Sequence, residues 1–279
     1  MRPIYTFGGE RSVRNLTLPD LRAAKAEGRT LSQSNASNAE DAAAIAATGV
    51  DLLSVASFRY DAARAAAPEI YTIAALGGPD LVTADDVLRE AFRVASLGAD
   101  GVYTIRSIAI VEMLAKEGIA VQGHVGLVPR KSILTGGLRA MGKTAREALA
   151  ILDDVRRLED AGAVAVEVEC VAAEAMAEIS AKTALITHTI GSGSGGDVVF
   201  LFCADICGDN PNPPRHARSF GDVATLREAV QAEKLLSLKA FAEAVRGATF
   251  PLPEVSVAME EGEHARLQEA LDNLKPLHL

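Results

Sequence analysis

Glu169 is the first candidate for acid–base chemistry in this chain, because it follows a short apolar and β-branched run at 164–168 and precedes another apolar pair at 170–171. A carboxyl group with apolar neighbours loses solvation, which raises its pKa toward neutrality and suits a general base or acid. Glu167 lies two residues earlier, on the same side of an extended segment, and is the candidate for a buried partner. The structural alternative for Glu169 is a strand-end carboxylate that pairs with a lysine or caps the next helix.

Two histidines stand beside glycine-rich segments. His124 lies between glycines in the segment VQGHVG at 121–126, where the absence of side chains lets a ligand approach the backbone. His188 precedes GSGSGG at 191–196, a loop whose amides suit a carboxylate or a phosphate. We interpret His124 as a candidate catalytic residue and His188, at the expected end of its strand, as a candidate substrate-binding residue. For each, the alternative is a purely structural histidine.

The elements that position these residues alternate between short β-branched runs and alanine-rich amphipathic stretches. Eight strands are predicted, at 30–34, 51–56, 70–76, 101–105, 119–123, 164–168, 184–188 and 198–202. The longest predicted helices are at 83–97, 144–160 and 223–247. Eight strands separated by helices in a chain of this length predict a closed (β/α)8 barrel of the TIM type. An open doubly wound sheet is the alternative, but it requires a glycine-rich loop where this chain has SNASN at 34–38.

A TIM barrel carries its catalytic groups at the carboxyl ends of its strands. That rule adds Asn35, Ser57, Arg59 and Arg106 to His188 as expected substrate-binding residues, with Glu169 and His124 catalytic. Either arginine supplies two parallel donors to a carboxylate. We expect one barrel domain over 1–258 and a helical tail over 259–279.

The composition excludes several classes of function. The chain has 279 residues, 49% of them hydrophobic, 4% aromatic and none of them tryptophan. A net charge of −9 argues against nucleic-acid binding. Three features favour a cytoplasmic protein. The apolar runs are too short for a membrane span, the first residues lack a signal-peptide core, and the chain has only three cysteines. We expect a small-molecule substrate and a homo-oligomer.

From about residue 14 to residue 257 the chain resembles the ketopantoate hydroxymethyltransferase (3-methyl-2-oxobutanoate hydroxymethyltransferase) family. The resemblance rests on GHVGLVP at 123–129 against GHxGLTP, GGLRAMG at 136–142 against GGxxxQG, and AGAVAVEVECV at 161–171 against AGAxxxxxECVP. IGSG at 190–193 and FP at 250–251 are similar to two further motifs, IGAG and the closing FP.

The resemblance implies a barrel of the phosphoenolpyruvate type and a step in pantothenate biosynthesis. In that chemistry a proton leaves the carbon beside the carbonyl of a 2-oxo acid, and the enolate attacks the methylene of 5,10-methylenetetrahydrofolate. A carboxylate-bound magnesium ion holds the acid. By the same resemblance, Glu169 falls on the general base and His124 on a substrate-contacting histidine.

The chain departs from this pattern where the family binds magnesium. Ser57 and Ala75 stand at the two aspartate positions, and YTIRS at 103–107 replaces KxEGG. We therefore expect no magnesium at Ser57 and Ala75, since alanine has no donor and a lone hydroxyl is a poor ligand for a hard cation. The leading hypothesis is a divergent hydroxymethyltransferase-like or aldol-type enzyme. The alternatives are a true hydroxymethyltransferase with relocated ligands such as Asp80, and a catalytically silent barrel that binds a small acid.

Overall fold

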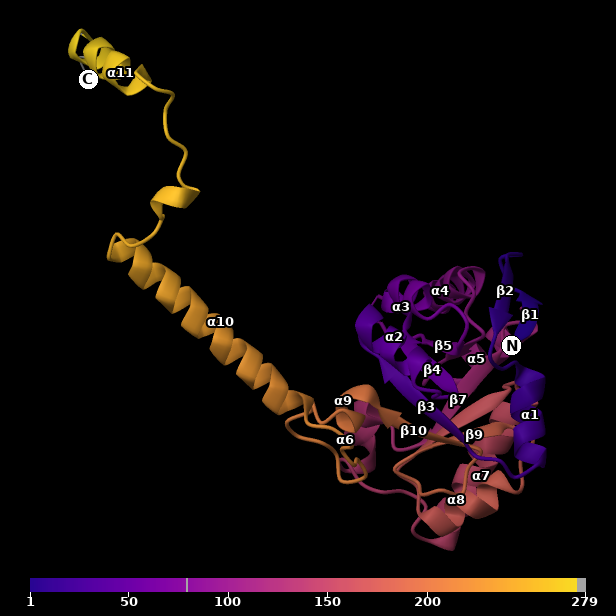
Figure 1. Ribbon diagram of the computed structural model, residues 1–279. Coiled ribbons are helices and arrows are strands. Elements are labelled where there is room, and N and C mark those ends of the chain that lie inside the picture. Colours follow the sequence, from indigo (N-terminus) through magenta and orange to yellow (C-terminus); the bar gives the residue numbers. More distant parts are fainter. Residues whose placement is uncertain (79, 275–279) are drawn as a thin grey trace. The chain divides into compact units, whose positions relative to one another are not determined.

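The computed structural model describes residues 1–78 and 80–274 and contains a closed barrel of eight parallel strands (Figure 1). The strands are β3 (Leu31–Ala36), β4 (Leu52–Ala56), β5 (Tyr71–Ala75), β6 (Gly101–Tyr103), β7 (Val121–Gly126), β8 (Ala165–Glu169), β9 (Ile186–Ile190) and β10 (Val198–Phe202). Neighbouring strands pair in chain order, and β10 closes the barrel by pairing with both β9 and β3. The predicted TIM barrel is confirmed.

Helices follow most of the strands and cover the outside of the barrel. They are α2 (Ala39–Ala47), α3 (Tyr60–Ala66), α4 (Ala84–Ser96), α5 (Ile108–Lys116), α7 (Ala145–Asp160) and α8 (Ala173–Ser180), with the short α6 (Ser132–Thr135) and α9 (Cys203–Ile206) near the strand ends. Residues 191–197 join β9 to β10 without a helix. Local signals fix several helix starts: at α4, Thr83 and Asp86 form a capping box.

The first thirty residues contain elements that the sequence did not predict. Strands β1 (Arg2–Tyr5) and β2 (Arg11–Arg14) form an antiparallel hairpin, and α1 (Leu18–Ala26) precedes the barrel. The buried guanidinium of Arg14 binds the Asp100 carboxylate at 2.7 Å, and Arg64 binds the other oxygen at 2.8 Å. Asp100 also accepts a hydrogen bond from the Thr72 amide at 2.9 Å. This ion cluster ties the hairpin to the amino ends of β5 and β6.

Two apolar clusters and one polar zone make up the interior. The larger cluster lies between the strands and the outer helices, and a smaller one, with Leu31, Leu52, Tyr71 and Val198, fills the amino end of the barrel. Toward the carboxyl end of the barrel the inward side chains become polar and stay buried, as at Gln33, Gln122, Glu167 and His188. Because side chains alternate along a strand, this change divides the barrel interior into a dry end and a polar end.

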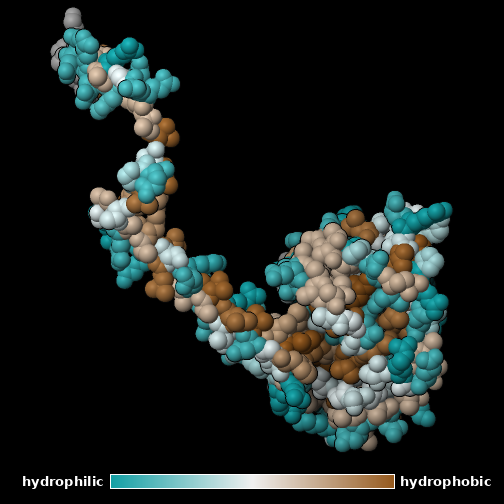
Figure 2. All heavy atoms as spheres, in the orientation of Figure 1, coloured by the Kyte–Doolittle hydropathy of each residue, from teal (hydrophilic) through white to brown (hydrophobic). Residues whose placement is uncertain are grey.

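The chain divides into two compact units, Met1–Asp222 and Val223–Leu279. The first unit contains the whole barrel. The second contains α10 (Val223–Arg246), the single-turn η3 (Pro253–Val255) and α11 (Glu263–Asp272). Apolar side chains are exposed along α10 (Figure 2), including Leu226, Val230, Leu235, Leu238 and Phe241. The boundary expected after residue 258 remains a prediction.

Candidate active site

A cavity of about 270 Å³ opens at the carboxyl ends of the barrel strands, and we call it the mouth cavity. Its lining comprises Gln33, Asn35, Ser54, Val55, Ala56, Ile73, Ala75, Tyr103, Gln122, Glu167, Glu169, Phe200 and Phe202. Two carboxylates and three carboxamides converge there, and none of these thirteen described residues is cationic. The mouth cavity therefore combines acid–base groups with neutral hydrogen-bonding groups.

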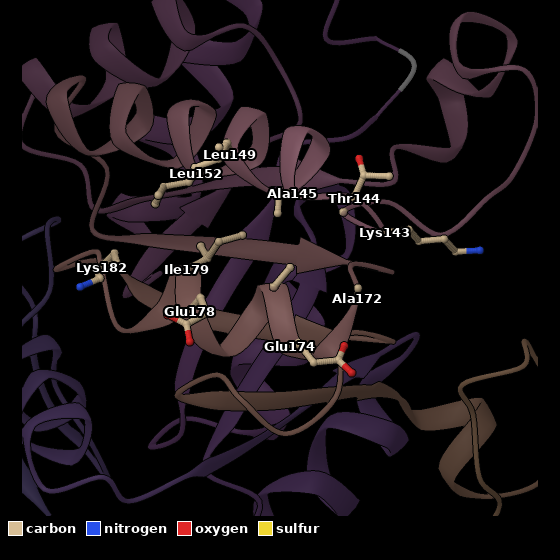
Figure 3. A pocket seen from close by; sticks show the side chains of 13 residues that line it. Lys143, Thr144, Ala145, Leu149, Leu152, Ala172, Glu174, Glu178, Ile179 and Lys182 are labelled. Carbon is tan, nitrogen blue, oxygen red and sulfur yellow. The ribbon is translucent and has the colours of Figure 1, made fainter.

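A larger groove of about 460 Å³ lies outside the barrel between α7 and α8 (Figure 3). Alanine and leucine side chains form much of its wall, while Glu174, Glu178 and Lys182 lie along its edge (Figure 3). In the barrel mouth, by contrast, burial raises the pKa of the Glu169 carboxyl to about 7. We therefore place the chemistry in the mouth cavity.

Glu169 is the last residue of β8, and its side chain is 18% exposed. Burial raises the pKa of its carboxyl to about 7, with Glu167 contributing in the same direction and His124 opposing. The sequence predicted a raised pKa for this carboxyl, and the cause is the expected one, burial. A carboxyl group that titrates near neutrality can both take up and release a proton at physiological pH.

His124 lies behind the two glutamates, and its side chain is only 1% exposed. Its Nε2 lies 2.8 Å from the Leu127 carbonyl oxygen and 3.7 Å from Glu169 Oε2. Its Nδ1 lies 2.9 Å from the Tyr103 hydroxyl and 3.3 Å from Glu167 Oε1. His124 does not line the mouth cavity, so it meets the substrate region through Tyr103 and the two carboxylates.

The charge of His124 follows from these partners. Burial lowers the pKa of the imidazole, but the hydrogen bond and negative charge of Glu167, with Leu127 and Glu169 adding to them, leave that pKa raised. The Tyr103 hydroxyl donates its one hydrogen to Glu167 at 3.1 Å, so its oxygen is left to accept a hydrogen bond from His124. His124 Nδ1 therefore carries a hydrogen in this arrangement. Burial and Glu167 both raise the pKa of the Tyr103 hydroxyl, which therefore remains a donor. Since Nε2 also faces the Leu127 carbonyl oxygen, both ring nitrogens of His124 face acceptors, which favours the imidazolium form.

The structure does not bring the two candidate arginines into the mouth cavity. Arg106 is exposed and donates to the carbonyl oxygens of Leu81 at 3.2 Å and Val82 at 2.7 Å. Arg59 donates to the Ser37 carbonyl and stacks on the Phe58 ring. Backbone carbonyls therefore occupy both guanidinium groups in this structure, and anchoring of an anion by either one remains a prediction.

The other expected substrate-binding residues fall in three different places. Asn35 lines the mouth cavity, and its side-chain oxygen accepts from the Cys203 amide at 2.9 Å. Ser57 is buried and lines a separate cavity together with Asp80. This cavity shares no lining residue with the mouth cavity. His188 lies in the middle of β9 rather than at its end, fully buried in the barrel, where it binds Gln33. Roles for these residues in substrate binding remain predictions.

Three residues of the site were missed or under-weighted in the sequence: Tyr103, Gln122 and Gln33. Tyr103 and Gln122 are register partners on β6 and β7, and Gln122 precedes His124 by two residues. The alternation of inward side chains along a strand is the signal that could have found Gln122. Gln122 lies near the start of β7, whereas the barrel rule points to strand ends.

The family model for ketopantoate hydroxymethyltransferase matches residues 60–253. The chain belongs to the ketopantoate hydroxymethyltransferase family. This membership confirms the resemblance seen in the sequence motifs.

Relatives of this family are moderately similar to the chain. A 3-methyl-2-oxobutanoate hydroxymethyltransferase from Pyrobaculum islandicum is 37% identical over 174 residues, which cover 61% of this chain and 64% of that protein. One from Hyperthermus butylicus is 34% identical over 190 residues, covering 67% and 64%. The matched region thus spans less than two thirds of these relatives. A putative phosphonomutase from Burkholderia cenocepacia has a TM-score of 0.53 at 13% identity over 80% of this chain and all of that one, which supports the barrel fold alone.

The residues present do not fit the magnesium site that the family implies. Ala75 lines the mouth cavity with a methyl group, and Ser57 lies in the other cavity with Asp80. Among the described residues, the group that could offer three ligand atoms to a metal is His124, Glu167 and Glu169, within 4.8 Å of one another. Both nitrogens of His124 already face protein partners. We derive no step through a metal ion.

The part of the chain that the structure describes has no helix combining the length and apolar character needed to cross a bilayer.

Proposed function

We propose that this protein makes or breaks a carbon–carbon bond beside the carbonyl of a small 2-oxo acid, with Glu169 as the general base. The observation that carries the proposal is a carboxyl group with a pKa of about 7 on the wall of a small cavity at the catalytic end of a barrel. Family membership supports the reaction class and the 2-oxo acid.

In the proposed first step Glu169 takes a proton from the carbon next to the carbonyl. The C–H bonding pair then forms a carbon–carbon double bond, and the carbonyl oxygen gains the negative charge. The imidazolium of His124, 3.7 Å from the Glu169 carboxylate, holds that side chain at the wall and stays paired with Glu167. The enolate carbon attacks the carbonyl carbon of the one-carbon aldehyde, whose C–O π pair becomes an alkoxide, and the proton held by Glu169 passes to that alkoxide to give the hydroxymethyl product. With 5,10-methylenetetrahydrofolate as the donor, one water molecule is consumed to supply the hydroxyl group and tetrahydrofolate is the leaving group.

The proposed one-carbon partner is 5,10-methylenetetrahydrofolate or a free aldehyde. The mouth cavity, at about 270 Å³, is smaller than the roughly 300–1,000 Å³ of pockets for drug-sized ligands. It is therefore suited to the small acid, and only the methylene-bearing end of a folate would enter it. As further proposals, the substrate is a small molecule and the protein assembles as a homo-oligomer.

The test is proton exchange without the second substrate. In D₂O the wild-type protein should replace the C3 proton of 3-methyl-2-oxobutanoate with deuterium, followed by proton NMR. Glu169→Gln is nearly isosteric and cannot accept the proton, so exchange should fall by about 10²- to 10⁴-fold. Asp154→Asn, in an exposed pair on α7, is the matched control and should exchange like wild type. Exchange by Glu169→Gln at the wild-type rate would show that another group is the base.

A further inference from the structure

Gln122 is buried in the barrel with its hydrogen-bonding capacity unused. Its side chain is on the polar part of β7 and is only 3% exposed. Among the residues that the structure describes, neither its amide nitrogen nor its amide oxygen has a hydrogen-bond partner. Buried polar groups are nearly always paired, because an unmet donor or acceptor costs free energy. This amide therefore stands ready for a ligand.

Gln122 borders two cavities. One is the mouth cavity, and the other is a small cavity of about 10 Å³ toward the amino end of the barrel. The small cavity is about the size that holds one water molecule. His188 also lines it, and the Nε2 atom of that histidine likewise has no described partner.

The protonation state of His188 decides which atom of the Gln122 amide faces each cavity. Gln33 presents its carbonyl oxygen to Nδ1 of His188 at 2.5 Å, so Nδ1 carries the hydrogen and Nε2 is an acceptor. Burial lowers the pKa of His188 to about 4, so the ring is neutral at physiological pH. A water molecule bound in the small cavity would have His188 Nε2 and Gln122 Oε1 as its two acceptors. With Oε1 bound in this way, the Gln122 amide nitrogen is the atom left for the mouth cavity, which Gln122 also lines.

The mouth cavity offers neutral donors for a substrate oxygen. Its lining has two carboxylates and no cationic side chain. Asn35 has its oxygen occupied by the Cys203 amide, which leaves its amide hydrogens as a second neutral donor near the rim. A carbonyl oxygen that gains negative charge beside Glu167 and Glu169 is stabilised by such donors, since they are already oriented before the reaction.

We propose that Gln122 holds the carbonyl oxygen of the substrate, its amide N–H donating to that oxygen as the enolate forms. This assignment rests on the proposed function and adds the residue that recognises the reacting carbonyl. Gln122 is then a catalytic residue, and His188 a positioning residue that acts through the buried water. The balance of the step is unchanged: the proton goes to Glu169, and the charge stays on the oxygen bound by Gln122.

The test compares Gln122→Met with Gln122→Glu in the full-length protein. Methionine fills a similar volume without polar donors, and glutamate replaces the N–H donor with an acceptor. Both variants should lower kcat for C3 exchange of 3-methyl-2-oxobutanoate by about 10²- to 10³-fold. KM and the calorimetric Kd for this acid should rise only about 3- to 10-fold, because the ground-state oxygen is a weaker acceptor. The melting temperature of Gln122→Met should not fall, since no hydrogen bond within the protein is lost.

The matched control is Thr72→Val, another buried polar-to-apolar change on a barrel strand. Thr72 is fully buried away from the mouth cavity, and its hydroxyl donates to the Ile70 carbonyl at 3.0 Å. This variant should keep kcat while its melting temperature falls. Gln122→Met with wild-type kcat would overturn the assignment, as would a loss of activity that only follows a loss of folded protein.

The failure of the proposed function gives a different result. If wild type binds 3-methyl-2-oxobutanoate without exchange and Gln122→Met weakens that binding, Gln122 recognises the carbonyl but the proton-transfer chemistry is wrong. If wild type exchanges and Gln122→Met does so equally, the chemistry stands and Gln122 is not its donor. Absence of binding by wild type rejects both.

Discussion

The replacement Glu169→Gln should stabilise the protein in a pH-dependent way while it removes the base. The folded-state pKa of Glu169 is about 7, against 4.5 for an unperturbed glutamate. Between these values the folded protein retains a proton that the unfolded chain has lost, so ionisation makes the wild type less stable as pH rises. A difference of about 2.5 pKa units at roughly 1.4 kcal/mol per unit gives about 3 kcal/mol.

The glutamine side chain has no such penalty, because it does not ionise. The free energy of unfolding of Glu169→Gln minus that of wild type should therefore grow by about 3 kcal/mol between pH 4 and pH 8. Urea denaturation followed by circular dichroism across this range measures the difference, with equal m-values showing that the same transition is compared. A difference that stays constant with pH would refute a buried, perturbed carboxyl at this position.

Three further outcomes are expected. The C3 exchange rate should rise about tenfold per pH unit below pH 7 and level off above it, because the base must be deprotonated; a flat profile from pH 5 to 7 contradicts this. Asp100→Asn should lower the free energy of unfolding by about 3–5 kcal/mol, because it leaves the buried Arg14 guanidinium without its counter-charge. The control Asp154→Asn, in an exposed ion pair, should change the free energy of unfolding by less than about 0.5 kcal/mol. Arg106→Ala tests the anchor predicted from the sequence. The carbonyl contacts of this guanidinium predict a calorimetric Kd for 3-methyl-2-oxobutanoate within about twofold of wild type, whereas a large loss of affinity would support Arg106 as the anchor.

The barrel could be predicted from the sequence because its strands are short β-branched runs between amphipathic helices. Strand 198–202 has the predicted bounds. Several strand ends are shifted by one to three residues, however, so His124 and Glu169 lie within β7 and β8 rather than after them. The amino-terminal hairpin was not predicted, since its polar strands have no apolar alternation and are held partly by the distant Asp100.

The candidate site was predictable only in its acid–base half. Glu169 could be found because burial of a strand-end carboxyl follows from its immediate neighbours in the chain. The direction of a long side chain such as Arg106 could not, because it depends on carbonyl acceptors that another loop supplies. Gln122 was hidden for a related reason: an inward-facing glutamine on a strand looks the same in sequence whether or not it finds a partner.

The ion cluster at Asp100 has a consequence for how the chain folds. Arg14 and Asp100 are separated by 86 residues, so the hairpin leaves the ribosome on the order of ten seconds before its counter-charge does. The barrel is closed in the same delayed manner, because Leu31 on β3 pairs with Val198 on β10. Such non-local contacts slow folding, because the chain loses the entropy of loop closure before the contact stabilises it. The hairpin is therefore made before Asp100 and can form this ion pair only after Asp100 has been made, so unfinished chains expose a cationic hairpin to chaperones and proteases.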